Sequence, residues 1–564
     1  MRYILSTLLV LLATVSFAQQ VIRGPYLQSP TDSSIVIMWR TDSATTSKVQ
    51  FGDCPTNLTE IVTDGASVTD HEIKLSGLNP YTKYFYSVGF DAVVLSGGNK
   101  QHHFTTHPTP GEVKPVRIWA IGDFGKGSQN QRDVWQAYMG YTDRETDVWL
   151  WLGDHAYNDG TDQEYQDKVF SSYYGYDSIF KFMPFYPTAG NHDYNSVSFG
   201  RTDPPAQHTG PYYDIVNVPT NGEAGGLASG YELYYSFDYS NIHFITINTE
   251  LWSTTASYDW VGALSSGAFA GSEMSDWLVQ DLQQNDKEWV VVYMHQPPYS
   301  KGSHDSDGLI ELVMKAVREN YLPILDSFNV DLVIGGHSHV YERSYLIKGH
   351  YDVSSTLAPS MLIDSSSGNP NLGEEYVKYL HPDSSKGTVY VVAGNSGSST
   401  TSPDLNHPAM YFSDGGNDIY GSLIIDINGN RLEGKYLRSN GSVLDEFAIV
   451  KPDGSAPDTS SRETDCTVGI FESSAHQGKG YLTVYPNPFN KEIIIDITIP
   501  TKGMTEVDLY SIDGKHIQNV YEGILNPGNY RYKVDAKQNV KPGVYFIRVK
   551  TDDAEYTQKI IKID

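Results

Sequence analysis

The sequence contains few cysteines and few basic residues, and each shortage excludes a class of protein. Only two of the 564 residues are cysteine, Cys54 and Cys466, so a metal site built from several thiolates is excluded. The two cysteines could form a disulfide or stay as free thiols, and the sequence leaves both open. Lysine and arginine number 40 against 68 aspartate and glutamate residues, which gives a formal charge of −28. Because such a chain repels nucleic acid and anionic membranes, we expect neither as a partner.

Long apolar runs are also lacking. After the N-terminal segment, no apolar run approaches the ~18 residues of a membrane-spanning helix. Residues 1–18 combine Arg2, an apolar stretch from Ile4 to Val15 and a small-x-small sequence that ends at Ala18. This pattern is typical of a secretory signal peptide, and the alternative is a buried core helix. We therefore expect a mature protein that is soluble, lies outside the cytoplasm and has no stable membrane span.

No tandem repeat is visible, but the pattern of apolar residues changes along the chain. Short alternating strands separated by turns predict a β-sandwich near the N-terminus. The long middle region alternates apolar runs with helix-like stretches at 128–142 and 272–284, which indicates an α/β (α+β) domain. The expected parts are a signal peptide at 1–18, a β-sandwich at 19–110, an α/β (α+β) domain at 114–450, a polar linker at 451–480 and a small all-β unit at 481–564.

Five apolar runs of the middle region lead directly into residues that can bind a metal ion. In α/β sheets the ligand site lies off the carboxyl ends of the strands, so strands placed side by side bring such residues together. Glycine at four of these ends permits a sharp exit and a close approach of the backbone to a ligand. The segments are Gly122-Asp123, Gly153-Asp154-His155-Ala156-Tyr157, Gly190-Asn191-His192-Asp193, His295 and Gly336-His337-Ser338-His339.

The chemical types in this set suit a pair of metal ions. Carboxylates, an amide, imidazoles and a phenol are ligands for iron, zinc or manganese, and they outnumber the ligands of one tetrahedral zinc. Two metals that share a carboxylate therefore fit better. Each segment alone has an ordinary alternative, since Gly-Asp is a common turn and His295 could be a buried core histidine. Their joint occurrence at five strand ends favours a functional site.

These five segments resemble the metal-binding blocks of the calcineurin-like metallophosphoesterases. Tyr157 narrows the resemblance to the purple acid phosphatases, in which a tyrosine at this place binds ferric iron, and Tyr341-Glu342-Arg343-Ser344 is also similar to that family. The segment Arg23-Gly24-Pro25-Tyr26-Leu27-Gln28 resembles the fibronectin type III-like N-terminal domain of the plant-type members. The resemblance covers residues 20–450 and implies a metallophosphoesterase sandwich behind that N-terminal domain.

The resemblance also implies a binuclear centre of Fe(III) and a divalent Fe, Zn or Mn. A phenol has an ordinary pKa near 10 and becomes a ligand only when a strongly Lewis-acidic ion displaces its proton, so Tyr157 favours Fe(III). The implied ligands are Asp123, Tyr157 and His339 for the first metal, Asn191, His295 and His337 for the second, and Asp154 as the bridge between them.

Two further histidines are implied to face the substrate phosphate. His192 and His304 would donate hydrogen bonds, and one of them would protonate the leaving group. Plant-type members often carry two adjacent histidines where this chain has His304 and Asp305, which leaves the leaving-group acid and the pH optimum open. The alternative for His304 is a solvated loop histidine.

The expected function is that of a secreted acid phosphatase that hydrolyses phosphate monoesters by attack of metal-bound hydroxide. A phosphodiesterase or nucleotide-specific esterase with the same site is the alternative. A binding protein with an inactive centre would have lost a ligand, whereas every ligand position is filled here. Because the global charge has the wrong sign for a phosphate substrate, its attraction would come from the bound cations.

The C-terminal unit carries a second resemblance. The segments Tyr485-Pro486-Asn487-Pro488-Phe489, 543–549 and 558–563 resemble the sorting domain of the type IX secretion system of Bacteroidetes-type bacteria. This resemblance implies the type IX machinery as a partner and an extracellular or cell-surface location. The alternative is a carbohydrate-binding or spacer domain.

Overall fold

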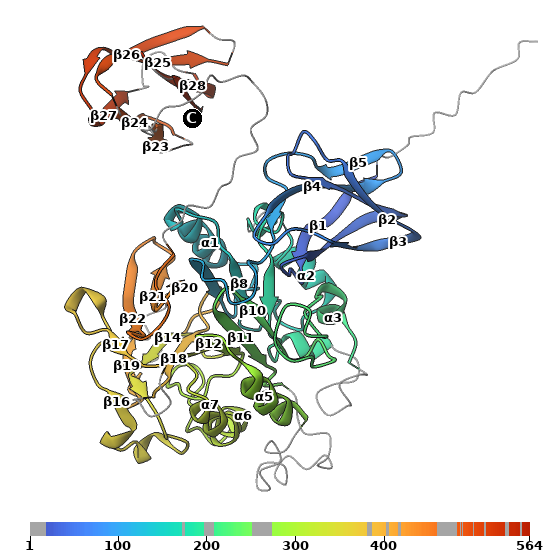
Figure 1. The fold of residues 1–564 in the computed structure, drawn as a ribbon, viewed down its shortest axis with the longest axis vertical. Coiled ribbons are helices and arrows are strands. Elements are labelled where there is room, and N and C mark those ends of the chain that lie inside the picture. The colour runs from blue at the N-terminus through green and yellow to red at the C-terminus, as the bar shows by residue number, and fades with distance from the viewer. Residues whose placement is uncertain are drawn as a thin grey trace, which may run out of the picture. The chain divides into compact units, whose positions relative to one another are not determined.

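The computed structural model describes residues 19–563 except 172–174, 197–207, 251–272, 381–385, 402–404, 416–418, 459–481, 486, 488, 500, 513–514, 536–540 and 553–554. The expected signal peptide lies outside the described residues. The chain forms two compact units, Met1–Val468 and Gly469–Asp564 (Figure 1). Cys54 is disulfide-bonded, and Cys466 lies outside the described residues.

The first unit begins with a six-stranded sheet that folds over its own core. Strand β2 pairs with β1, β3 and β4, and β4 also pairs with β5 and β6. Leu27, Ile35, Ile37 and Trp39 are among the residues buried inside it. The predicted N-terminal β-sandwich is confirmed. Its strands are β1 (Val21–Gln28), β2 (Ser34–Gly52), β3 (Glu60–Ser76), β4 (Lys83–Phe90), β5 (Val93–Gly97) and β6 (His103–Thr105).

This β-sandwich packs on the rest of the unit through the segment that begins at Arg23. The Arg23 guanidinium is buried and lies 2.9 Å from the Asp162 carboxylate. The Tyr26 ring belongs to the main hydrophobic core of the unit, and its hydroxyl donates to the Ile215 carbonyl at 3.1 Å. The two parts of the first unit therefore share a core.

The remainder of the first unit is built on two seven-stranded sheets. One has the order β10-β11-β12-β13-β18-β14-β19 and the other β17-β22-β21-β20-β7-β8-β9, and residues of both sheets line the same core. The first sheet contains β10 (Tyr235–Tyr239), β11 (Ile242–Ile247), β12 (Trp289–Met294), β13 (Leu332–Gly335), β14 (Tyr341–Ser344), β18 (Val389–Ala393) and β19 (Met410–Ser413). The second contains β7 (Val116–Ile121), β8 (Val148–Trp151), β9 (Phe185–Pro187), β17 (Tyr376–Val377), β20 (Gly421–Asn428), β21 (Arg431–Arg438) and β22 (Val443–Val450).

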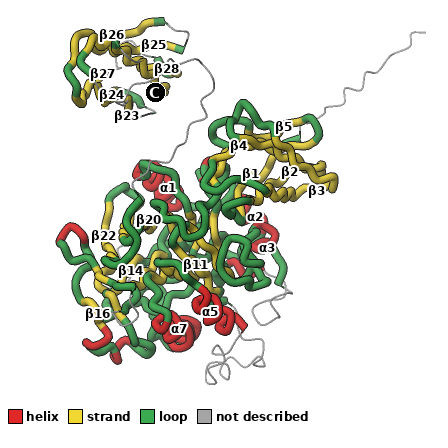
Figure 2. The backbone as a smooth tube through the Cα atoms, viewed as in Figure 1, coloured by secondary structure: helices red, strands yellow, loops and turns green. Residues whose placement is uncertain are grey.

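Helices are few and lie at the periphery of this strand-rich region (Figure 2). Both predicted helices are present, since 128–142 contains α1 and 272–284 contains α5. The Ser128 hydroxyl caps α1 by accepting a hydrogen bond from the Gln131 amide. The helices are α1 (Gln129–Tyr141), α2 (Asp162–Lys168), α3 (Pro211–Ile215), α5 (Glu273–Gln284), α6 (Leu312–Ala316) and α7 (Leu322–Ser327). No helix within the described residues is both long and apolar enough to span a membrane.

The five apolar runs singled out in the sequence are strands β7, β8, β9, β12 and β13. The expectation that they lie side by side is wrong, because three of them belong to one sheet and two to the other. Within each sheet they are adjacent and parallel. The two groups still meet, because the His295 imidazole that follows β12 lies 2.8 Å from the Leu152 carbonyl that follows β8.

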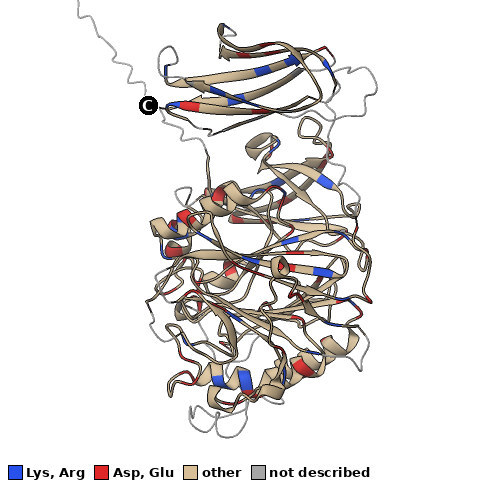
Figure 3. Ribbon diagram, turned by 90° about the vertical axis from the view of Figure 1, so that its left-hand side faces the viewer, with Lys and Arg blue, Asp and Glu red and all other residues tan. Residues whose placement is uncertain are grey.

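The second unit is a small all-β structure with a separate core. Its sheets have the orders β23-β24-β27 and β26-β25-β28-β29. Ile493, Ile495, Val507 and Ile547 are among the residues buried between them. Charged residues are spread along most elements of both units (Figure 3). The strands are β23 (Leu482–Tyr485), β24 (Glu492–Ile499), β25 (Gly503–Ser511), β26 (His516–Leu525), β27 (Gly528–Asp535), β28 (Gly543–Thr551) and β29 (Glu555–Lys562).

Candidate metal centre

Three side chains that sequence analysis assigned to one metal lie in mutual contact. The Tyr157 hydroxyl lies 3.0 Å from Asp123 Oδ1 and 3.3 Å from His339 Nε2. His339 Nε2 is 3.4 Å from the same Asp123 oxygen. Two ligands that share one ion are separated by about 3 Å, since each metal–ligand bond is about 2 Å long. This spacing can accommodate one cation between the three side chains.

A second set of donor atoms surrounds His295. Its Nε2 lies 3.1 Å from Asn191 Oδ1 and 3.4 Å from Asp154 Oδ1. The centroid of the His337 ring is 5.0 Å from that of His295. This separation suits two imidazoles on one ion, given nitrogen–metal bonds of about 2 Å.

The two sets adjoin each other at buried carboxylates. Asp123, Asp154 and His295 offer ligand atoms that all lie within 4.8 Å of one another. The backbone amide of His337 donates to Asp123 Oδ2 at 2.8 Å, and that of His192 donates to Asp154 Oδ1 at 2.8 Å. The structure therefore brings all seven predicted ligand residues into one cluster.

The backbone of this cluster is held in an unusual conformation. Asp123, Asp154 and His337 have φ values of 56°, 54° and 63°, in the left-handed region that non-glycine residues rarely adopt. Such residues cost of order 1–3 kcal/mol each and gather at functional sites. Glycine leaves room for the carboxylates, because a Cβ at Gly190 would lie 2.3 Å from Asp154 Oδ1 and one at Gly336 would lie 2.7 Å from Asp123 Oδ2.

The electrostatics of the cluster favour a bound positive charge. Burial raises the pKa of Asp154 to about 6, and the Asp123 carboxylate acts in the same direction. Burial also opposes ionisation of Asp123, but a hydrogen bond to His339 and nearby histidine charges lower its pKa to about 2. Burial and both carboxylates raise the pKa of Tyr157 well above its ordinary value. A bound cation would allow these oxygens to ionise together, so the residues present fit a metal pair.

Three family profiles match the chain in succession. The profile described as Purple acid Phosphatase, N-terminal domain matches residues 23–106, and the one described as Calcineurin-like phosphoesterase matches residues 116–341. The profile described as Secretion system C-terminal sorting domain matches residues 483–563. The chain carries a calcineurin-like phosphoesterase domain behind a domain of the purple acid phosphatase N-terminal type. It is a phosphoric ester hydrolase.

The chain is also similar to individual proteins. An uncharacterised protein of Mycobacterium tuberculosis is 25% identical over 418 residues, which cover 68% of this chain and 71% of that protein. Purple acid phosphatase 1 of Ipomoea batatas is 26% identical over 279 residues, which cover 49% of this chain and 51% of the plant enzyme. The solved structure of a purple acid phosphatase from yellow lupin (Lupinus luteus) seeds covers 77% of both chains with a TM-score of 0.54 and 19% identity. At this identity the lupin structure is evidence for the fold alone.

In this phosphoesterase the two predicted substrate-facing histidines both adjoin the cluster. His192 Nδ1 lies 2.6 Å from the Asn158 carbonyl, and its Nε2 is 3.9 Å from Asp154 Oδ2. The His304 ring centroid is 3.8 Å from that of His337. Both side chains are about one-third exposed, at 31% and 33%. The contact with His337 disfavours the alternative of a freely solvated loop histidine at position 304.

Asp193 has a structural part in the site that sequence analysis did not assign. Its fully buried carboxylate accepts hydrogen bonds from the amides of Gly190, Asp154 and His155 at 2.8, 2.9 and 3.0 Å. It also accepts one from the Tyr165 hydroxyl at 2.7 Å. One side chain thus ties the loop after β8 to the loop after β9.

Two other side chains at the site, those of Lys126 and Glu311, were not among the candidates predicted from the sequence. Lys126 lies three residues after Asp123, and its ammonium lies 3.2 Å from the centroid of the Tyr157 ring. The Glu311 carboxylate contacts both His304 and His337. The closeness of Lys126 to Asp123 in the sequence is a signal for its place at the site, whereas Glu311 belongs to none of the five segments.

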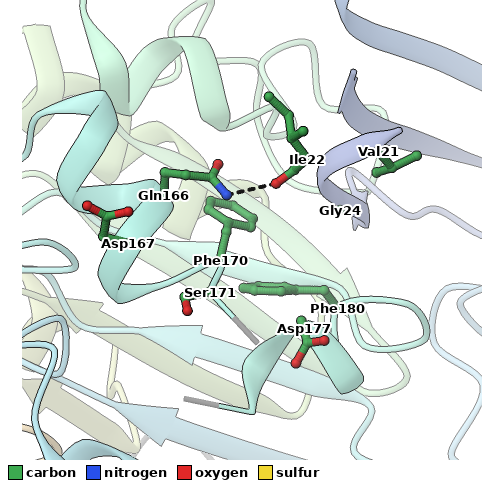
Figure 4. A pocket seen from close by; sticks show the side chains of 9 residues that line it. All are labelled: Val21, Ile22, Gly24, Gln166, Asp167, Phe170, Ser171, Asp177 and Phe180. Carbon is green, nitrogen blue, oxygen red and sulfur yellow. Dashed lines mark hydrogen bonds between the residues drawn. The ribbon is translucent and has the colours of Figure 1, made fainter. Parts of the chain in front are cut away.

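A separate cavity of about 400 Å³ lies between β1 and the segment that contains α2 (Figure 4). None of the candidate metal ligands lines it. Phe170 and Phe180 form its apolar part, Asp167 and Asp177 contribute carboxylates, and Gln166 donates to the Ile22 carbonyl at 2.7 Å. The seven candidate metal ligands therefore lie outside this cavity.

Proposed function

We propose that this phosphoesterase is a secreted acid phosphatase with a binuclear metal centre that hydrolyses phosphate monoesters. The observation that carries the proposal is the spacing of 3.0–3.4 Å among the donor atoms of Asp123, Tyr157 and His339. These three residues would hold Fe(III). Asn191, His295 and His337 would hold a divalent Fe, Zn or Mn, and Asp154 would be shared by both ions.

Two bound cations would supply charge neutralisation on the phosphoryl oxygens and a water of lowered pKa. The residues of the chain supply the rest of the chemistry. The Asn158 carbonyl accepts a hydrogen bond from His192 Nδ1 and orients the ring, so Nε2 is the nitrogen on the side of Asp154. In the imidazolium form this Nε2 would donate to a phosphate oxygen at the cluster. His304 lies beside His337, where it can donate to the ester or leaving-group oxygen. The partly exposed histidines leave the site open to a substrate from solvent.

A substrate panel tests the proposed reaction. The purified metal-loaded protein would be assayed with p-nitrophenyl phosphate and with bis(p-nitrophenyl) phosphate under the same conditions. We expect a higher kcat/KM for the monoester by at least about tenfold, which corresponds to about 1.4 kcal/mol of preference in the transition state. A preference for the diester would contradict the proposal and favour a phosphodiesterase with the same site.

The C-terminal sorting domain indicates secretion or a cell-surface location. We further propose that residues 1–18 direct export from the cytoplasm and that the tail engages the type IX secretion machinery. The proposed boundaries are 19–110 for the N-terminal domain, 114–450 for the phosphoesterase domain, 451–480 for the linker and 481–564 for the tail.

A further inference from the structure

A single carboxylate connects a predicted metal ligand with a predicted substrate-facing histidine. Glu311 immediately precedes α6, and its side chain is only 13% exposed. Its Oε1 lies 2.8 Å from His304 Nδ1, and its Oε2 lies 3.7 Å from His337 Nε2. The three side chains offer donor atoms within 4.8 Å of one another.

The residue next to His304 is engaged elsewhere. Asp305 accepts two hydrogen bonds from the Lys301 ammonium, at 2.8 and 3.0 Å. The same ammonium lies 3.0 Å from Asp307. Asp305 is thus part of an ion-pair network within its own loop, and Glu311 is the carboxylate that contacts His304.

The His304 ring is held on two sides. The Glu311 carboxylate accepts the hydrogen bond from Nδ1–H, and the ring face packs on His337 with a centroid distance of 3.8 Å and an angle of 30°. A carboxylate bound to one imidazole nitrogen fixes the rotation of the ring and the direction of the other nitrogen. The remaining nitrogen, Nε2, is then the one available to a substrate.

We propose that Glu311 is a positioning residue that orients His304 toward the leaving group of the phosphate ester. The proposal rests on the proposed phosphatase function, and it adds to that function the residue that orients the proton donor, His304. Glu311 acts through His304 and does not touch the substrate.

This role predicts a dependence on the leaving group. Help with proton transfer matters most when the departing oxygen is a poor leaving group, as in an alkyl phosphate, and least for p-nitrophenolate. A residue that merely supports the fold or the metals would affect both substrates equally. The ratio of the two losses therefore separates positioning of His304 from a structural role.

The test compares Glu311→Ala and Glu311→Gln with Asp305→Asn, a control in the same loop. We expect Glu311→Ala to lower kcat for glycerol phosphate about 10- to 100-fold and kcat for p-nitrophenyl phosphate less than about threefold, with metal content unchanged. Glu311→Gln keeps an oxygen that can accept from Nδ1–H and should recover part of the loss. Asp305→Asn should change neither rate, and Glu311→Ala should add nothing in a His304→Ala background.

Equal losses on both substrates, loss of metal from Glu311→Ala, or additive effects with His304→Ala would each overturn the positioning role. Failure of the underlying function would show itself differently. In that case the unaltered metal-loaded protein would hydrolyse neither monoester, and both proposals would fall together.

Discussion

Asp154 is the residue that we propose to bridge the two halves of the metal cluster. Its carboxylate is buried and lies 3.4 Å from His295 Nε2. One of its oxygens also lies within 4.8 Å of a ligand atom of Asp123. Its position allows it to serve two cations at once, which none of the other six predicted ligands is expected to do.

Replacement of Asp154 should therefore remove both metals. We expect Asp154→Ala and the isosteric Asp154→Asn to lose both ions and to lower phosphatase activity by more than about 100-fold, the size of effect seen when one stabilising group is removed from an active site. Elemental analysis of the purified variants checks this. A variant that keeps two metals per chain would contradict the bridging role.

A buried histidine remote from the metal cluster gives a pH-dependent contribution to stability. His243 lies between Asp238 and Asp281, at 2.7 and 2.8 Å, and Lys287 is 3.2 Å from Asp238. Burial lowers the pKa of His243, but the two carboxylates outweigh it and raise the value to about 9. Because the folded-state pKa is raised, the stabilisation is complete below the unfolded value of about 6.5 and is lost as pH rises through 9.

Substitution of His243 should accordingly destabilise the protein more at acidic than at alkaline pH. We expect His243→Asn to reduce the free energy of unfolding by about 3 kcal/mol at pH 6 and by clearly less at pH 9.5. Thermal unfolding of both proteins across this pH range measures the difference. A destabilisation that is the same at both pH values would refute the linkage.

Most residues of the metal cluster could be singled out from the sequence, because they closely follow apolar runs, in four cases through a glycine. Tyr157 lies five residues beyond its run and was singled out by the family resemblance. Glu311 could not, since no motif surrounds it and its contacts depend on how the loop that begins at Lys301 folds back. Asp193 belongs to the predicted segment Gly190-Asn191-His192-Asp193, but its role depends on four hydrogen bonds that only the folded loops create.

At the scale of elements, the strands and the two predicted helices follow from local pattern. The distribution of the strands over two sheets does not. Strands β7 (VRIWAI) and β12 (WVVVYM) are buried along their whole length, so their sequences carry no alternation that would assign them to one sheet or the other. The pairing is decided by tertiary packing, which the apolar runs alone do not encode.

An ion pair connects the two sheets directly. Arg343 on β14 makes a bidentate contact with Asp445 on β22, with distances of 2.6 and 2.9 Å, and both side chains are buried. Loss of one partner would leave the other charge uncompensated in the core, which costs about 3–5 kcal/mol.

We expect Arg343→Met to destabilise the first unit by that amount. The pair of Arg431 and Glu433 on β21, in which each side chain is about one-third exposed, provides the control, and Arg431→Ala should cost less than about 1 kcal/mol. Denaturant unfolding of the two variants makes the comparison. Equal losses of unfolding free energy in the two variants would show that the buried pair does not hold the sheets together.

At the scale of the whole molecule, the metal cluster and the segment that matches a sorting domain lie in separate units. The second unit has its own core of residues from Val484 to Ile560, and the metal cluster lies entirely in the first unit. A formal charge of −28 disfavours contact with anionic surfaces, so we expect the attraction of a phosphate substrate to come from the cluster itself.

Removal of residues 481–564 should therefore leave the enzyme active but change where it accumulates. We expect the truncated protein to keep the same kcat/KM and to stay in the periplasm of the producing bacterium. Activity measured in periplasmic and extracellular fractions tests this. Unchanged release into the medium would exclude a sorting role for the tail.

The central claim is that two cations lie between side chains contributed by two sheets, with Tyr157 bound to Fe(III). Elemental analysis together with a visible spectrum of the purified protein tests it most directly. We predict two metals per chain, one of them iron, and a visible absorption band that disappears in Tyr157→Phe. A colourless, iron-free protein with full activity, or a band that persists in Tyr157→Phe, would contradict the account.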